Sequence, residues 1–350
     1  MLRKKKSVNA DRDNEYRYNS LSSAASGTCK QFTSAHGTSE VTAIAAANPP
    51  TCLSGTKSGE LAICRHTTGE IVQKWGGHEK EITKVACGGQ NRELYVSASR
   101  DKTISVWRCS SDSTKSGPQY RFSGHDLVVT GVAVSPSGSH ILSGSRDNTV
   151  RLWDVSSGQC VQTMALAQNV VTHVGWSHCS GSSMAAQSSE DKTVRLWDTQ
   201  SLRVAVTTAP KQYIQTCCDV TGPNDRLCLS ASNGFSGSGC EASLWDLRMT
   251  ARPLREFTGH IETVTGCCFV PFSSRFIAAT CSNDGTVRLW GCDSGENLAT
   301  VSIPAAGPLT CISPNVDSML YVSTFYAGIQ VLSVGQNATE TIGLQRTAAF

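Results

Sequence analysis

Long apolar runs are missing from this 350-residue chain, and their absence excludes an integral membrane segment. A bilayer-spanning helix needs roughly 20 consecutive apolar residues, and no segment approaches that length. The N-terminus, from Met1 to Lys6, is basic, but no apolar stretch follows it, so it lacks the second part of a secretory signal. These absences predict a soluble, cytoplasmic protein.

A large excess of charge of one sign is missing as well. The chain has 31 basic and 28 acidic residues, which gives a formal net charge of +3. Nucleic-acid-binding domains usually carry a concentrated basic face, so we expect no nucleic-acid partner. The basic N-terminus would contribute about 1 kcal/mol per lysine near an anionic surface, which predicts at most a weak contact with a membrane surface.

The 16 cysteines include no Cys-x-x-Cys pair, which removes the commonest spacing of a zinc site. In the absence of a secretory signal, we expect reduced thiols that pack as small apolar side chains. Several lie inside apolar, strand-like runs, namely Cys87, Cys217, Cys218, Cys267, Cys268 and Cys311. The glycine-rich segment 234–239 lacks the lysine of a P-loop and is interpreted as a lengthened turn. We therefore expect neither a metal nor a cofactor.

An internal repeat dominates what is present. Four segments each combine a polar turn with an alternating strand that ends in tryptophan: 99–107, 145–153, 189–197 and 282–290. Trp245 closes a fifth, variant copy, and Cys64 and Leu332 occupy the tryptophan position of degenerate first and last copies. The seven positions lie 42 to 48 residues apart. A Gly-His pair precedes three of the tryptophans, at Gly77-His78, Gly124-His125 and Gly259-His260, and His36 opens a weaker copy.

This pattern resembles the WD-repeat family, in which each repeat forms a four-stranded blade. The resemblance implies an all-β, seven-bladed WD-repeat β-propeller closed by an N-terminal strand. We expect the propeller over residues 29–335, a disordered basic and polar tail over 1–28, and a C-terminal tail over 336–350. Residues 30–33 are predicted to supply the outer strand of the seventh blade, so that both ends of the chain meet in one sheet.

Histidine, hydroxyl, aspartate and tryptophan recur together at fixed spacing. In the family they form a structural hydrogen-bond network, and a buried indole and imidazole need such partners. Three equivalent copies also argue against catalysis, since an enzyme needs one such arrangement, and we predict no catalytic residue. The predicted tetrads are His78, Ser97, Asp101 and Trp107; His125, Ser143, Asp147 and Trp153; and His260, Thr280, Asp284 and Trp290. The fourth blade has Ala167 and Gln187 in the histidine and hydroxyl positions, and the fifth has Lys211, so we expect these two blades to be less rigid.

In the family the aspartate turns and Gly-His loops share one face, here called the aspartate-turn face. Arg100 and Arg146 could hold a partner's phosphate there, or could be solvated or paired with aspartate. The candidate partner-binding residues are Arg100, Lys102, Arg146, Asn148, Glu190, Lys192 and Tyr213 on this face, and Asp246 and Arg248 on the opposite face.

Seven threonines fall at matching positions in all seven repeats, on the innermost strand, and predict a ring at the mouth of the channel: Thr42, Thr83, Thr130, Thr172, Thr216, Thr265 and Thr310. Strand propensity alone does not explain the same residue seven times.

The sequence thus predicts a non-enzymatic scaffold that binds other proteins. Segments such as 78–87 and 232–242 further resemble WD-repeat proteins of cilium assembly and intraflagellar cargo traffic, which implies a location at the cilium or its base. The alternative is an adaptor or substrate receptor of a cullin-4-type ubiquitin ligase, because residues 245–248 resemble a Trp-Asp-x-Arg docking box.

Overall fold

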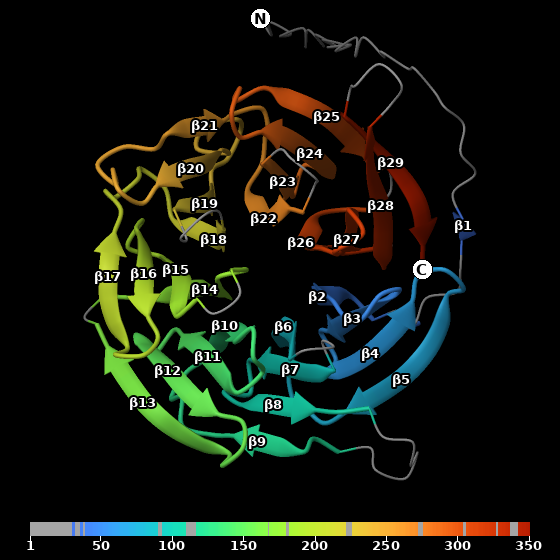
Figure 1. The fold of residues 1–350 in the computed structure, drawn as a ribbon. Helices are drawn as coiled ribbons and strands as arrows, with labels where there is room; N and C mark the ends of the chain where they lie inside the picture. Colours follow the sequence, from blue (N-terminus) through green and yellow to red (C-terminus); the bar gives the residue numbers. More distant parts are fainter. Residues whose placement is uncertain are drawn as a thin grey trace, which may run out of the picture.

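The computed structural model describes residues 30–31, 36–37, 39–89, 93–109, 117–166, 168–179, 182–221, 226–271, 276–303, 306–326, 328–336 and 342–350. Seven antiparallel sheets stand around a central channel like the blades of a propeller (Figure 1). The predicted tail over residues 1–28 lies outside the described residues. No helix in the described ranges could span a membrane.

Each blade runs from an inner strand at the channel to an outer strand at the rim. The first three blades are β2 (Val41–Ala46), β3 (Thr51–Thr56), β4 (Glu60–Arg65) and β5 (Glu70–Gly76); β6 (Ile82–Gly88), β7 (Leu94–Ser99), β8 (Ile104–Trp107) and β9 (Tyr120–Phe122); and β10 (Val129–Val134), β11 (His140–Ser145), β12 (Thr149–Asp154) and β13 (Gln159–Ala165). The next three are β14 (Val171–Trp176), β15 (Met184–Ser189), β16 (Val194–Asp198) and β17 (Arg203–Thr207); β18 (Gln215–Thr221), β19 (Leu227–Ser232), β20 (Ala242–Asp246) and β21 (Arg255–Phe257); and β22 (Val264–Val270), β23 (Ile277–Ser282), β24 (Thr286–Gly291) and β25 (Asn297–Ser302).

The seventh blade contains both ends of the described chain. Its strands are β26 (Leu309–Pro314), β27 (Met319–Thr324), β28 (Ile329–Gln336), β29 (Ile342–Ala349) and β1 (Lys30–Gln31), in that order from the channel. The prediction that residues 30–33 supply the outer strand of the seventh blade is confirmed for Lys30 and Gln31, which form its outermost strand, but the fourth strand is β29, which pairs antiparallel with β28. β1 does join the sheet, but as a fifth strand parallel to β29. Of the segment predicted as a C-terminal tail, residues 342–350 are thus part of the propeller, and Ala348 and Phe350 are buried.

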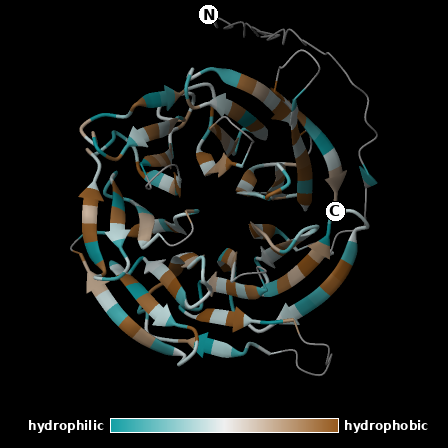
Figure 2. Cartoon of the chain, in the orientation of Figure 1, coloured by the Kyte–Doolittle hydropathy of each residue, from teal (hydrophilic) through white to brown (hydrophobic). Residues whose placement is uncertain are grey.

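Burial follows the position of a strand in its blade. The second and third strands of the second blade, β7 and β8, are buried on both faces, whereas the outer strand β13 alternates between exposed and half-buried residues. In Figure 2 hydrophilic and hydrophobic colours accordingly alternate along the outer strands. This is the pattern expected where two faces of a central strand meet neighbouring blades and one face of a rim strand meets water.

Aromatic contacts join neighbouring blades near the rim. Phe122 on β9 stacks on Trp153 of the next blade with ring centroids 5.1 Å apart, and Phe257 on β21 stacks on Trp290 at 5.4 Å. Each of these phenylalanines lies three residues before a Gly-His histidine. Tryptophans and outer-strand aromatics therefore form a repeated inter-blade contact, of a kind worth about 0.5–1.5 kcal/mol beyond the buried area.

The ring of threonines joins the inner strands. Each threonine occupies a β-bulge near the start of its strand, as Thr42 does between Val41 and Ala43. Its hydroxyl donates to a backbone carbonyl on the next blade at 2.5 to 3.0 Å, and the last bond, from Thr310 to Val41, closes the circle. A bulge leaves its residue outside the ladder of its own blade, so the side chain can serve the neighbour. The threonines therefore bond the blades together, which is a structural role.

Candidate functional site

The third blade shows how the tetrad residues are held together. His125 donates from Nδ1 to Asp147 Oδ2 at 2.8 Å, and Ser143 Oγ donates to Nε2 of the same ring at 2.8 Å. The indole of Trp153 then donates to Ser143 Oγ, also at 2.8 Å. The second and sixth blades repeat these distances within 0.1 Å. The hydroxyl is the shared partner of two buried rings, as the polar groups of a core require.

The aspartate fixes the Gly-His loop to its turn. Asp147 accepts from the amides of Asp126 and Thr149 at 3.0 and 2.9 Å, and from the Thr149 hydroxyl at 2.6 Å. The glycine before each histidine leaves room for the tryptophan: a Cβ on Gly77 would lie 2.8 Å from the Trp107 ring. In the second, third and sixth blades a buried carboxylate thus fixes the Gly-His loop at the aspartate-turn face.

These carboxylates make the aspartate-turn face sensitive to acid. Burial by itself raises the pKa of Asp147, but hydrogen bonds from His125 and Thr149 outweigh it and hold the pKa well below its ordinary value, as they do for Asp101 and Asp284. A lowered folded-state pKa stabilises the fold above the unfolded-state pKa of about 3.9, and this contribution is lost as the pH falls below that value.

We expect the urea midpoint to begin to fall near about pH 5 and to fall most steeply below about pH 4. In Asp147→Asn the midpoint should be lower at neutral pH and should decline less below about pH 4, because the variant has no carboxylate at this position to protonate. The measurement is a set of urea unfolding curves followed by tryptophan fluorescence. Parallel declines for the two proteins would show that Asp147 contributes no pH-dependent stability.

The fourth blade has a complete network built from other residues. Trp197 donates to Gln187 Oε1 at 2.7 Å, and Gln187 Nε2 donates to Asn169 Oδ1. Arg195 bridges Asn169 to Asp191. Asn169 thus contributes where the sequence suggested Ala167, which lies outside the described residues. An asparagine two positions after Ala167 thus supplies the partner of Gln187, and the lower rigidity expected of this blade stays a prediction.

The first and fifth blades have shorter networks. Ser54 Oγ and His36 Nε2 lie 2.7 Å apart, and burial first, then the charge of Lys74, lowers the pKa of His36 to about 4, so this imidazole is neutral. In the fifth blade Trp245 donates to Ser230 Oγ at 3.0 Å, and Lys211 pairs with Glu241 at 3.2 Å. An ion pair therefore stands where other blades have histidine and aspartate.

A family model described as "WD domain, G-beta repeat" matches residues 69–108, 116–154, 158–198 and 251–291. The chain is a seven-bladed WD-repeat β-propeller. The tryptophan positions without a match belong to blades one, five and seven, where the sequence has Cys64, an enlarged turn and Leu332.

Curated relatives share a limited segment with this WD-repeat chain. It is 42% identical over 84 residues to "Small ribosomal subunit protein RACK1" of Dictyostelium discoideum, which is 23% of this chain and 26% of that protein. The protein of the same name from Drosophila melanogaster is 41% identical over 85 residues, or 24% of this chain and 27% of the relative. The chain therefore aligns with about a quarter of the length of each.

The two arginines proposed for phosphate are both engaged by carboxylates. Arg100 Nε lies 2.7 Å from Glu81, and Arg146 Nη2 lies 2.7 Å from Glu190 on the next blade. Both guanidinium groups are half-exposed. A phosphate would have to displace a glutamate from each arginine, so the paired alternative accounts for them better, with glutamate and not aspartate as the partner.

The remaining candidates on the aspartate-turn face shape the turns of the propeller. Lys102, Asn148 and Lys192 occupy the same turn position with positive φ values of 73°, 66° and 72°. The hydroxyl of Tyr213 lies 2.8 Å from Ser238 Oγ in the glycine-rich turn. Asp246 and Arg248 lie on the opposite face and pair with each other through two bonds, one of them at 3.0 Å.

An exposed apolar arc on the aspartate-turn face was missed from the sequence. We define it as Phe235, Ile261 and Tyr326, which are 70%, 55% and 74% exposed. Gly237 N donates to Ile261 O at 2.8 Å, and Thr263 Oγ1 donates to Gly234 O at 3.0 Å, so the enlarged turn is bonded to the following Gly-His loop. The only sequence feature that pointed to this surface was the glycine-rich segment 234–239, which was interpreted as a lengthened turn.

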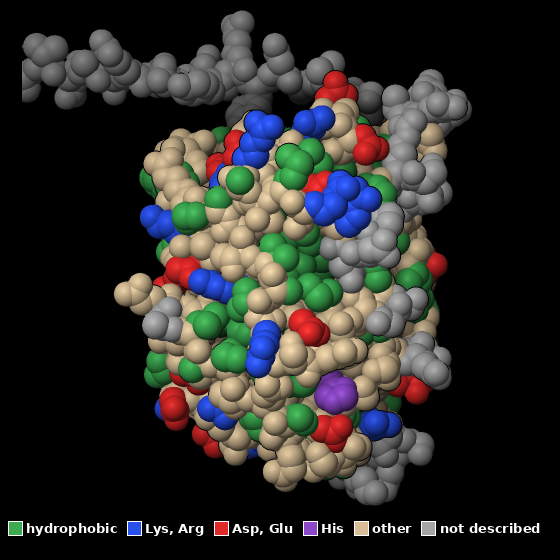
Figure 3. Space-filling model, turned by 60° about the vertical axis from the view of Figure 1, so that its left-hand side comes forward, with side chains coloured by type: hydrophobic (Ala, Val, Ile, Leu, Met, Phe, Trp, Pro, Cys, Tyr) green, Lys and Arg blue, Asp and Glu red, His purple; other side chains and the backbone are tan. Residues whose placement is uncertain are grey.

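Charge is mixed over the side of the propeller that carries blades three to five. Figure 3 shows basic and acidic side chains interspersed there, without an extended patch of one sign. Among the described residues no group of histidine, cysteine, aspartate or glutamate side chains is arranged to hold a metal ion.

Proposed function

We propose that this WD-repeat propeller is a non-enzymatic scaffold that binds a protein partner on the aspartate-turn face, at blades five to seven. The observation that carries the proposal is the apolar arc. Phe235, Ile261 and Tyr326 lie on turns and loops of blades five, six and seven at one face and have large exposed fractions. Large apolar side chains grouped on a rigid surface and surrounded by polar residues are typical of protein interaction sites.

The rigidity of the aspartate-turn face supports this function. Tyr326 lies over Gly307, where a Cβ would come within 2.4 Å of the tyrosine ring, and Tyr213 lies in the same way over Gly239. Rings that are already held in place lose little conformational entropy when a partner binds. The paired arginines beyond the arc are better suited to the polar rim of such an interface than to its centre.

The test is co-purification from cells with a Phe235→Ser, Ile261→Ser double variant. We expect specific partners to be lost at least tenfold, since removing two central apolar contacts costs about 2–4 kcal/mol of binding. The matched control is Val161→Ser, which removes a side chain of similar exposure (57%) on the outer strand β13, away from the face. Both variants should unfold at the wild-type urea concentration. An unchanged partner list for the double variant would refute the location.

The same co-purification experiment can distinguish two narrower functions. The resemblance of residues 78–87 and 232–242 to WD repeat-containing protein 31 favours a role in cilium assembly and cargo traffic, with a location at the ciliary base or in the cytoplasm. The alternative, an adaptor of a cullin-4-type ligase, is favoured by Arg248 and the exposed Met249 beside it on the opposite face. Arg248→Ala should remove ligase components alone if that alternative holds, and the arc variant should leave them bound.

A further inference from the structure

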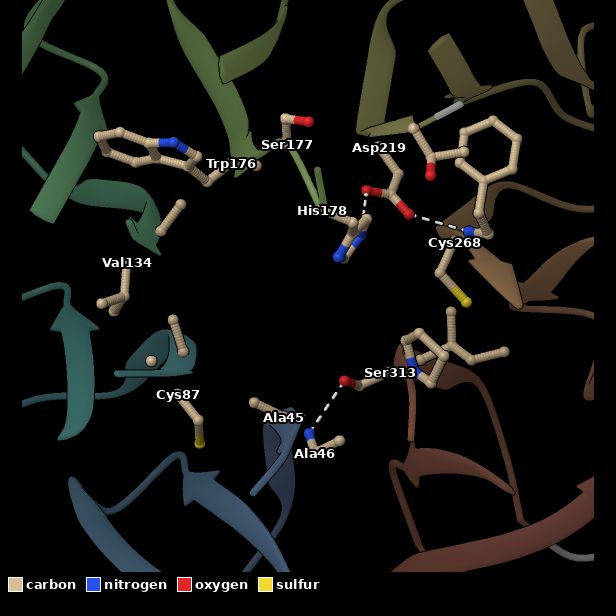
Figure 4. A pocket seen from close by; sticks show the side chains of 18 of the residues that line it. Ala45, Ala46, Cys87, Val134, Trp176, Ser177, His178, Asp219, Cys268 and Ser313 are labelled. Atoms are coloured by element: carbon tan, nitrogen blue, oxygen red, sulfur yellow. Dashed lines mark hydrogen bonds and ion pairs between the residues drawn. The ribbon is translucent and has the colours of Figure 1, made fainter. Parts of the chain in front are cut away.

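The central channel contains a cavity of about 710 Å³. Its walls are the inner strands of the blades and the turns that follow them, on the face opposite the aspartate turns (Figure 4). The ring threonines are absent from the lining, which begins just beyond them. Each ring hydroxyl is bonded to the next blade, so the ring narrows one end of the channel, and the cavity extends from the ring toward the opposite face. A volume of about 300–1,000 Å³ is typical of sites for small molecules.

Three of the residues that directly follow the threonines line the deep end of this cavity, namely Lys84, His173 and Cys217. The seven residues at this position are Ala43, Lys84, Gly131, His173, Cys217, Gly266 and Cys311. Most are small, and only Lys84 and His173 have long polar side chains. Gly131 cannot be larger, because a Cβ there would lie 2.6 Å from the Val174 amide of the next blade. The small neighbours leave the space beside Lys84 open.

Lys84 reaches across the channel from the second blade to the seventh. Its Nζ lies 3.2 Å from Cys311 Sγ, and no carboxylate pairs with it within the described ranges. The Lys84 side chain is half-buried in the wall of the cavity, and the ammonium group of a partly exposed lysine is charged at neutral pH.

The carboxylate that lines the same cavity is already occupied. Asp219 accepts from His178 Nε2 at 2.9 Å, from the Val220 amide at 2.9 Å and from the Phe269 amide at 2.8 Å. Figure 4 shows His178 beside the open centre of the cavity with Asp219 behind it. A half-buried ammonium without a carboxylate partner has lost part of its hydration, and a bound anion offsets that cost. The space beside Lys84 thus favours a negative ligand group.

We infer that the channel binds a small organic carboxylate, with its anionic group at the Lys84 ammonium beside His173. The rest of the ligand lies toward Ala45, Val132 and Trp176, which line the cavity and favour an apolar body. The single ammonium group of Lys84 would pair with the single negative charge of such a ligand. This site is separate from the apolar arc, because the lining contains none of the arc residues.

The experiment is a thermal shift and calorimetric titration of the full chain with butyrate as the probe. We expect butyrate to stabilise the wild type with a saturable dose dependence, and butyramide, its neutral analogue of the same shape, to have no effect. In Lys84→Met the affinity should fall at least tenfold, because about 1.4 kcal/mol or more of charge-assisted binding is lost. The matched control, Lys80→Met, removes an exposed lysine from the same blade and should bind butyrate as the wild type does.

Two further results decide the proposal if Lys84→Met folds poorly. Lys84→Arg retains the charge and should retain dose-dependent stabilisation, and bromide soaked into crystals should give an anomalous peak beside Nζ in the wild type. Equal stabilisation by butyramide, or an unchanged affinity in a folded Lys84→Met, would overturn the inference. The absence of any stabilisation by butyrate together with an empty bromide map would overturn it as well. Neither result bears on the partner list of the arc variant, so the two proposals fail separately.

Discussion

A chain that ends at Gln336 is expected to lose its cooperative fold. The deletion removes β29, which pairs with β28 from Gln336 to Gln330 and supplies the fourth strand of the seventh blade. It also removes the buried side chains of Ile342 and Phe350 and the two backbone bonds between Phe350 and Ile329. Burial of an apolar side chain of this size contributes about 1.5–3 kcal/mol, and the total stability of a domain is only about 5–15 kcal/mol.

The damage should extend beyond one blade because the ring closes through the seventh sheet. Thr310 bonds to Val41 of the first blade, and Ser313 Oγ accepts from the Ala46 amide at 2.9 Å. We expect the truncated chain to aggregate through the uncovered edge of β28 and to show no sharp thermal transition. Removal of residues 1–29 is the matched control and should preserve the transition. A truncated chain that melts within a few degrees of the wild type would show that β29 is dispensable.

Ser143→Ala is expected to destabilise the propeller by about 2–4 kcal/mol, since two buried groups lose their partner at about 1–3 kcal/mol each. The hydroxyl accepts from Trp153 Nε1 and donates to His125 Nε2, and both rings are buried. Urea unfolding gives the free energy directly, with an unchanged slope as the sign that only stability has changed. The large effect of a single oxygen atom follows from its position between two rings.

Two variants separate the network from simple packing. Ser143→Thr keeps the hydroxyl, and Thr280 already serves this role in the sixth blade, so most of the stability should return. Ser137→Ala removes an exposed turn hydroxyl on the same blade and should change the free energy by less than about 0.5 kcal/mol. If Ser143→Ala were no more harmful than Ser137→Ala, the tetrad would not be a stabilising unit.

Much of the architecture can be predicted from short segments of the sequence. The polar turn, the alternating strand and its terminal tryptophan lie within about ten residues of one another, so one repeat can be recognised without knowledge of the others. The tetrads were predictable for a similar reason. A buried indole and a buried imidazole must find partners, and the serine or threonine ten residues before each tryptophan is the partner that the structure joins to them.

The tertiary structure decided whatever depends on the meeting of distant segments. The sequence placed a ring of threonines, but only the bulges and the neighbouring carbonyls reveal that they bond blade to blade, over a separation of 269 residues for Thr310 and Val41. Likewise, Asn169 could replace a missing histidine only because Arg195 and Gln187 lie beside it in space.

The closure of the ring gives the clearest contrast. Residues 30–33 were predicted to supply the outer strand of the seventh blade, whereas residues 342–349 were placed in a C-terminal tail. The two segments compete to pair with the free edge of β28. β29 occupies that edge, and its register with β28 is longer than the register of β1 with β29. Three other features likewise depend on segments that are distant in the sequence. They are the glutamate partners of Arg100 and Arg146, the apolar arc, and the approach of Lys84 to Cys311. Repeats and turns are set by neighbours along the chain, whereas these contacts exist only once the ring has closed.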